Sequence, residues 1–221
     1  MAIPMHKYLF PFVMPAIIAA LVFPVAGRID LPFFWLAVII PIIVGFAFGP
    51  FIDQDLIRER MNPAPGGCDR HLRTLGAPLF FIMLIVAALD VGRYHWSDIV
   101  PLPLQIAGLT AFALGLSFSA WALVVNRFFS PVVRIQHERG HQLVTSGPYA
   151  WVRHPGYAGG FFGWTGLTLG LGSYVALLPL LPMYALMVRR ILIEERVLLE
   201  NLEGYREYAA RVRYRLLPGV W

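Results

Sequence analysis

The segment His141–Gly159 gathers polar side chains between two long apolar stretches. It contains two histidines, an arginine, two tyrosines, a threonine and a serine, together with two prolines. A chain that crosses a membrane needs few ionisable groups merely to fold, and such groups at the end of an apolar stretch usually line a site. Together with nearby residues, the group of interest comprises Gln136, His137, His141, Tyr149, Arg153, His154 and Tyr157.

A second polar group follows near the C-terminus and consists of Arg190, Glu194, Glu195, Tyr205, Tyr208, Arg211 and Arg215. If the intervening stretch turns back through a membrane, the two groups meet on one side. An arginine or histidine can then bind a carboxylate, a glutamate an ammonium group, and a tyrosine a sulfonium group through cation–π attraction. This combination of side chains suits a zwitterion such as S-adenosylmethionine.

Other chemistries lack their sequence patterns. There is no glycine-rich phosphate loop and no Gly-x-Ser-x-Gly turn. Cys68 is the single cysteine, so neither an internal disulfide nor a cysteine metal cluster is possible. His137 and His141 are four residues apart and could bind a metal with Glu194 or Glu195. Gly140 argues against a firm helix there, so we expect no metal.

The composition indicates an integral membrane protein, because 58% of the 221 residues are hydrophobic and only 14% are charged. Five apolar stretches run over Tyr8–Ala26, Pro32–Ile52, Leu75–Leu89, Pro101–Val125 and Tyr157–Val188. The last is too long for one ordinary span, and Gly170–Tyr174 offers a turn near its middle. We therefore predict an all-α, polytopic membrane helical bundle of five to six transmembrane helices with a C-terminal helical hairpin. Glycines at positions 159, 160, 163, 166 and 170 predict close helix packing.

The basic residues indicate the topology. With six crossings, 16 of the 18 lysines and arginines lie on one side of the membrane. The positive-inside rule places that side, with both termini, in the cytoplasm. Topology thus explains the net charge of +5, and no nucleic acid partner is expected. We expect one multi-pass membrane domain over 1–221, with N-terminal helices in 1–125 and a cofactor-binding region in 126–221. The tail is expected to form an amphipathic helix over Ile191–Tyr208, in which Gly204 is a point of possible interruption.

The ordered motifs resemble the isoprenylcysteine carboxyl methyltransferase family and, more loosely, the phospholipid N-methyltransferases. The cofactor-binding half is similar in His141–Val144, Gly147–Tyr149 and Arg153–Gly159. The C-terminal half is similar in Glu194–Glu195, Gly204–Tyr205, Tyr208, Arg215 and Pro218. The resemblance covers roughly Asn126–Pro218, and 1–125 carries no motif of the family that can be placed.

The resemblance implies S-adenosylmethionine as the cofactor and a lipidic or prenylated small molecule as the methyl acceptor, with membrane lipids around the protein. The implied cofactor-binding residues are Gln136, His141, Gln142, Leu143, Val144, Gly147, Tyr149, Arg153, His154, Pro155, Gly156 and Tyr157. The implied catalytic residues on the acceptor side are Arg190 with Glu194 or Glu195, in a register uncertain by one residue. The accepting atom, whether oxygen, nitrogen or sulfur, stays open.

Two other functions remain open at this point. A membrane reductase of the sterol reductase type is similar in its C-terminal region but would bind NADPH there. A non-enzymatic membrane protein would bind no small ligand.

Individual residues also have plainer interpretations. Tyr149, Trp151 and Tyr157 could form an interfacial aromatic belt. Arg206, Arg211 and Arg213 are expected to contact lipid headgroups.

Overall fold

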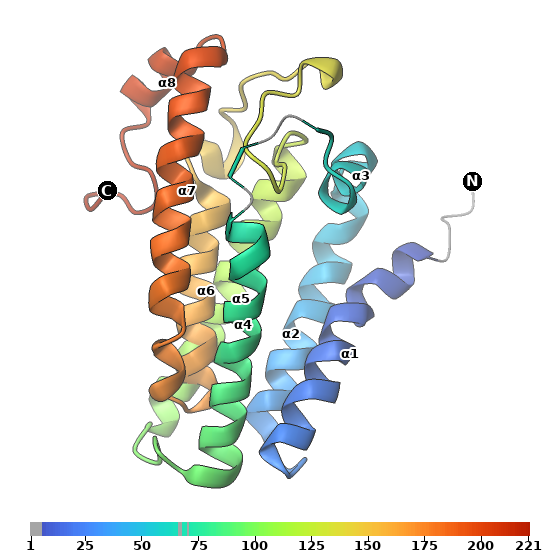
Figure 1. Ribbon diagram of the computed structural model, residues 1–221, viewed down its shortest axis with the longest axis vertical. Helices are drawn as coiled ribbons and strands as arrows, with labels where there is room; N and C mark the ends of the chain where they lie inside the picture. Colours follow the sequence, from blue (N-terminus) through green and yellow to red (C-terminus); the bar gives the residue numbers. More distant parts are fainter. Residues whose placement is uncertain (1–5, 66–67, 70) are drawn as a thin grey trace.

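The computed structural model describes residues 6–65, 68–69 and 71–221, and the regular elements within these ranges are helical, as predicted (Figure 1). The six long helices are α1 (His6–Ala26), α2 (Pro32–Phe48), α4 (His71–Leu89), α5 (Leu102–Val125), α6 (Pro155–Leu171) and α7 (Leu180–Asn201). Two short helices, α3 (Gln54–Met61) and α8 (Tyr205–Arg211), lie near one end of the bundle (Figure 1).

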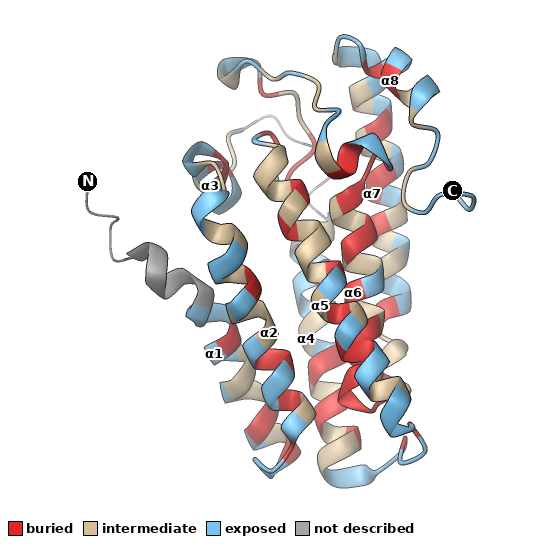
Figure 2. Cartoon of the chain, turned by 180° about the vertical axis from the view of Figure 1, so that it is seen from behind, coloured by how far each residue is buried: buried red, intermediate tan, exposed pale blue. Residues whose placement is uncertain are grey.

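The apolar stretches of the sequence correspond to the long helices. Four helical segments are long and apolar enough to cross a membrane, namely Pro32–Phe51, Thr74–Tyr94, Leu102–Val125 and Val175–Asn201, and Phe12–Ala26 is a shorter apolar helix. Large apolar side chains such as Ile17, Ile43 and Leu181 are exposed on the outside of the bundle, where Figure 2 shows extensive exposed surface. The protein is a polytopic helical bundle.

The uncharged stretch Tyr157–Val188 folds as the predicted hairpin. Helix α6 ends at Leu171, and Gly172 follows with a φ of +89°, a conformation that favours glycine. Helix α7 then runs back beside α6 (Figure 1). The hairpin therefore returns the chain to the end of the bundle from which α6 started, and it brings the two polar groups of the sequence together.

Helices α5 and α6 approach each other through glycine. A Cβ atom on Gly115 would lie 2.5 Å from the carbonyl oxygen of Gly159, and one on Gly108 would lie 2.5 Å from the backbone nitrogen of Gly170. Side chains at these positions would prevent the contact. Gly160 instead faces Met187 of α7, so this member of the predicted glycine row does not serve the α5–α6 interface.

The loops at the two ends of the bundle differ in size and charge. One end, which we term the site end, carries α3, the segment 126–154, α8 and the C-terminal tail 212–221 (Figure 1). The opposite end is closed by Asp90, a buried residue that accepts hydrogen bonds from the Ser97 backbone (2.9 Å) and the Ser173 hydroxyl (2.5 Å). Arg70, one of the basic residues counted in the topology, lies outside the described residues.

The predicted amphipathic helix over Ile191–Tyr208 is wrong in its bounds. Helix α7 continues without a break from the hairpin to Asn201, and Gly204 adopts a φ of +76° before α8 begins at Tyr205. The positive φ at Gly204 stops the helix and redirects the chain. Tyr205 and Tyr208 then turn inward and are buried.

Candidate functional site

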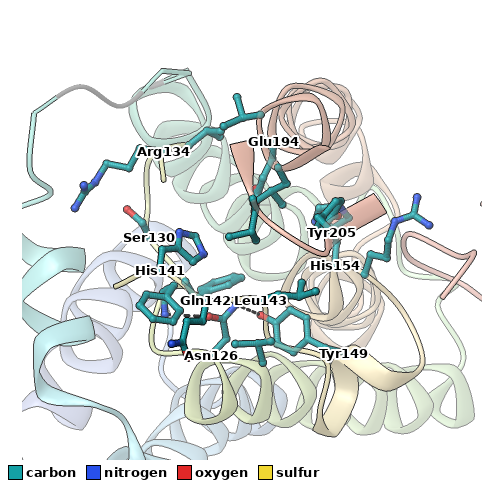
Figure 3. A pocket seen from close by; sticks show the side chains of 18 of the residues that line it. Asn126, Ser130, Arg134, His141, Gln142, Leu143, Tyr149, His154, Glu194 and Tyr205 are labelled. Atoms are coloured by element: carbon teal, nitrogen blue, oxygen red, sulfur yellow. Dashed lines mark hydrogen bonds between the residues drawn. The ribbon is translucent and has the colours of Figure 1, made fainter. Parts of the chain in front are cut away.

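A pocket opens at the site end between the segment 126–154, the C-terminal part of α7, and α8 (Figure 3). Ten of the residues singled out from the sequence line it: His141, Gln142, Leu143, Val144, Tyr149, Arg153, His154, Glu194, Tyr205 and Tyr208. Apolar side chains of α7, among them Val197 and Leu198, complete one wall. The pocket thus combines a few polar groups with an apolar surface, which is typical of cofactor sites.

His141 presents a neutral imidazole to this pocket. Its ring stacks on Phe128 at 4.5 Å between centroids, and its Nδ1 accepts a hydrogen bond from the Gln136 backbone N–H (3.3 Å). Burial, reinforced by the nearby charges of Arg139 and His137, lowers the pKa of His141 to about 4. Because Nδ1 is an acceptor, the proton of the neutral ring lies on Nε2, which can donate to a ligand.

Tyr149 is held in place by one hydrogen bond at its side chain and one at its backbone. Its hydroxyl accepts a hydrogen bond from the Asn126 side-chain amide (3.1 Å), and its carbonyl accepts one from the Tyr208 hydroxyl (2.7 Å). Burial raises the pKa of Tyr149 well above its ordinary value, so the phenol stays protonated. The fixed ring therefore offers the pocket an aromatic edge and a hydroxyl donor, and this buried residue is not part of an interfacial belt.

Arg153 and Glu195 form a buried ion pair that holds the tail. The Arg153 Nε lies 2.5 Å from Glu195 Oε1, and its Nη1 donates to the carbonyls of Val212 and Arg213, both at 2.8 Å. Arg215 binds the other oxygen of Glu195 at 2.5 Å. The backbone N–H groups of Arg153 and His154 also donate to the tail, at 3.0 and 2.9 Å. Both oxygens of Glu195 are thus bound by arginines, and Glu195 does not line the pocket.

His154 occupies a buried position beside this ion pair. Its Nε2 lies 3.4 Å from Glu195 Oε1 without the alignment of a hydrogen bond, and it has no hydrogen-bond partner among the described residues. A buried polar atom without a partner costs free energy unless a ligand or water supplies one. His154 therefore has hydrogen-bonding capacity to spare in the pocket wall.

Arg190 and Glu194 lie one turn apart on α7, and the Tyr157 hydroxyl lies between them. The hydroxyl accepts from Arg190 Nε (2.6 Å) and donates to Glu194 Oε2 (2.9 Å). Arg190 Nη1 also donates to the Asp69 carbonyl (3.0 Å). Neither Tyr157 nor Arg190 lines the pocket, whereas Glu194 does. Of the two glutamates that the sequence left open, Glu194 is the one that faces the pocket.

The remaining residues predicted from the sequence do not line the pocket but position residues that do. The Gln136 side chain is buried; it donates to the Phe128 carbonyl (2.7 Å) and accepts from Arg139. Gly147 has a φ of +58° at the start of the turn that places Tyr149. Pro155 begins α6, and Gly156 lies so near Phe129 that a Cβ atom would come within 2.5 Å of the ring.

The N-terminal half contributes residues that the sequence analysis did not find. Glu59 of α3, which is buried, binds Arg134 through two contacts of 3.0 and 2.8 Å and accepts from the Ser130 hydroxyl (2.8 Å). Burial alone would raise the pKa of Glu59, but the hydrogen bonds from Arg134 and Ser130 outweigh it and lower that pKa. In the sequence, one feature points to Glu59: its spacing of three residues from the apolar Leu56 places both on one helix face. Both side chains are buried in the structure.

Two further residues named from the sequence, Trp151 and His137, lie at the surface. Trp151 is 58% exposed and stacks with Phe118, as an interfacial aromatic residue would. His137 lies exposed on the surface. Within 6–65, 68–69 and 71–221, no group of three or more histidine, cysteine, aspartate or glutamate residues is arranged to hold a metal ion.

Comparison with known proteins connects this geometry to described families. The phospholipid methyltransferase family matches residues 104–203, from α5 to the end of α7. A protein-S-isoprenylcysteine O-methyltransferase of Schizosaccharomyces pombe is 34% identical over 49% of this chain and 47% of its own length. The Tribolium castaneum protein of the same name is 37% identical over 53% of this chain and 41% of its own length.

A second kind of relative matches over a longer part of the chain. The nickel-cobalt-cadmium resistance protein NccN of Alcaligenes xylosoxydans xylosoxydans is 29% identical over 67% of both chains. The chain spans about half the length of the two isoprenylcysteine methyltransferases. The family model, which matches residues 104–203, includes most of the residues that line the pocket.

Proposed function

We propose that the chain is a member of the isoprenylcysteine carboxyl methyltransferase family and that it transfers a methyl group from S-adenosylmethionine to a hydrophobic or lipidic acceptor in the membrane. The observation that carries the proposal is the junction at Glu194, which lines the pocket and is joined through Tyr157 to the buried Arg190. A cofactor side and an acceptor side meet at this residue.

The residues of the pocket fit S-adenosylmethionine, whose sulfonium supplies an electrophilic methyl group. His141 Nε2 and the Tyr149 hydroxyl can donate hydrogen bonds, and the spare capacity of His154 suits a polar group of the ligand. Leu143, Val144 and Leu198 offer apolar surface to the rest of the molecule. Glu194 supplies a negative charge, which can attract an ammonium or sulfonium group.

Arg190 suits an acceptor carboxylate. Its Nε and Nη1 are fixed by Tyr157 and by the Asp69 carbonyl, which leaves Nη2 to bind an incoming anion. A carboxylate is already nucleophilic, so alignment with the methyl group is the main task of the protein. An amine acceptor would first have to lose a proton, and Glu194 could accept it. Glu195 takes no chemical part in this scheme and positions Arg153 instead.

The charges of the pocket favour this function over a nicotinamide-dependent reductase. Phosphate groups of NADPH require several available arginines. The two arginines that line the pocket, Arg134 and Arg153, are already bound to Glu59 and Glu195. We further propose that the site end faces the cytoplasm, from which a soluble cofactor would enter, because that end carries most of the basic residues.

Calorimetric titration of the detergent-purified protein with S-adenosylhomocysteine, and separately with NADPH, tests the proposal. We expect saturable binding of S-adenosylhomocysteine only, weakened about tenfold by His141→Ala, which is the loss of roughly 1.4 kcal/mol expected for one buried donor. His137→Ala removes an exposed histidine four residues away and serves as the matched control. Binding of NADPH alone would refute the proposal.

A further inference from the structure

A second hollow lies on the outer face of α7, away from the cofactor pocket. Its walls are Leu192, Arg196, Leu199 and Glu200 of α7, Arg206 of α8 and Arg215 of the tail, with Glu195 at its inner side. We term it the outer groove. In Figure 1 the tail descends from α8 beside α7, which explains how residues of three segments meet here. Nothing in the proposed methyl transfer uses this groove.

The outer groove lies at the level where α7 leaves the membrane. About 20 helical residues cross the hydrocarbon core. Counted from Val175, where the apolar segment begins, 20 residues end at Glu194. Leu192 and Leu199 therefore lie on either side of the boundary between the acyl chains and the headgroups. Both leucine side chains are exposed, at 49% and 37%.

Three arginines give the groove a positive charge. Arg196 and Arg206 are exposed, and Arg206 Nε donates to the Leu199 carbonyl (3.2 Å). The terminal amines of Arg206 make no hydrogen bond within the described part of the chain, so they can bind a ligand. Arg215 binds Glu195 through Nε and stacks on Trp221 at 5.0 Å. Glu195 is neutralised by Arg153 as well, so Glu200 is the one carboxylate of the groove that offsets the arginines.

Apolar groups around the arginines point to a lipid rather than to a free anion. Leu217 and Val220 of the tail are 40% and 73% exposed, close in sequence to Arg215 and Trp221. Exposed leucines, a terminal tryptophan and arginines at one level of a membrane protein match a phospholipid, whose phosphate is anionic and whose chains are apolar.

We propose that the outer groove binds the phosphate of a membrane phospholipid between Arg196 and Arg206, with an acyl chain along Leu192. Of the three arginines that the sequence suggested as headgroup contacts, only Arg206 lines the groove, whereas Arg211 and Arg213 do not. Arg215 connects the groove to Glu195, which also binds Arg153 in the wall of the cofactor pocket. A bound phospholipid therefore holds the tail from its outer side.

The test measures, by native mass spectrometry, how tightly short-chain phosphatidylglycerol binds to the delipidated, detergent-purified full chain. We expect saturable binding that Arg196→Gln with Arg206→Gln weakens at least tenfold. Arg211→Gln with Arg213→Gln removes the same charge from the same end and should change the affinity less than twofold. S-adenosylhomocysteine binding, measured on each variant, reports whether the fold and the cofactor pocket are intact independently of the groove.

Three results would overturn the proposal. An equal loss in both double variants would mean general attraction between charges. Inorganic phosphate that binds as tightly as phosphatidylglycerol would mean an anion site without a lipid. Unchanged binding in the single variant Arg196→Gln and in the groove double variant would mean that the lipid binds elsewhere.

Discussion

Arg190 and Glu194 are joined through one hydroxyl, since Tyr157 accepts from the first at 2.6 Å and donates to the second at 2.9 Å. The bridge fixes a positive and a negative side chain on neighbouring turns of α7, so neither can rotate without losing a charge-assisted hydrogen bond. The family resemblance implied that Tyr157 binds the cofactor, but Tyr157 does not line the pocket. We therefore propose that it positions Arg190 and Glu194 instead.

Tyr157→Phe separates these two roles. Loss of the bridging hydroxyl should lower kcat/KM for a prenylated acceptor, such as N-acetyl-S-farnesylcysteine, about tenfold, because two charge-assisted hydrogen bonds lose their partner. The affinity for S-adenosylhomocysteine should stay within twofold of the original. A parallel loss of both quantities would instead return Tyr157 to the cofactor wall.

The neighbouring glutamates should respond differently to the same substitution. Glu194→Gln should reduce turnover and leave the melting temperature nearly unchanged. Glu195→Gln removes the charge that binds Arg153 and Arg215, and breaking a buried pair of this kind costs about 3–5 kcal/mol. Its melting temperature should fall by roughly 10 °C, measured by thermal unfolding in detergent. The opposite pattern would mean that Glu195 is the catalytic carboxylate.

The pKa of His141 has a consequence for cofactor binding. Because burial holds this pKa at about 4, below the ordinary 6.5, the imidazole stays neutral as the pH falls through 6.5 and gains a proton only near pH 4. The contribution of His141 to S-adenosylhomocysteine affinity should therefore be constant between pH 5.5 and pH 8. A step near pH 6.5 that disappears in His141→Ala would contradict the buried, neutral state.

The glycine contact between α5 and α6 can be tested by adding one methyl group. Gly115→Ala should destabilise the protein, because its Cβ atom would lie 2.5 Å from the Gly159 carbonyl and would push the helices apart. Gly49→Ala is the control, since a Cβ atom there has no neighbour within 4 Å. Thermal unfolding should show a lower melting temperature for the first variant only, and equal values for both would contradict the close contact.

The hairpin and the neighbouring positions of Arg190 and Glu194 could be predicted because their signals are local. A stretch from Tyr157 to Val188 without a charge has to stay in the membrane, and the glycines near its middle allow a turn. Arg190 and Glu194 share a helix face by their spacing alone. The choice between Glu194 and Glu195 could not be made, because it depends on how α7 is rotated against α6 and the tail.

The contribution of α3 could not be predicted for a different reason. Glu59 and Arg134 are far apart in the sequence, and neither lies in a recognisable motif. Gln136 was predicted to bind the cofactor, but it does not line the pocket. Its side chain donates to the carbonyl of Phe128, on whose ring His141 stacks. Support of this kind depends on tertiary contacts, and a residue type alone does not reveal it.

The ion pair between Glu59 and Arg134 also limits how this chain can exchange parts with its relatives. The family resemblance lies in the second half, yet the wall of the pocket in that half is fastened to a helix from the first. A chimera that replaces residues 1–125 with those of a homologue would leave Arg134 buried beside an unmatched surface. Recombination is therefore expected to succeed only where α3 and the segment 126–154 come from the same parent.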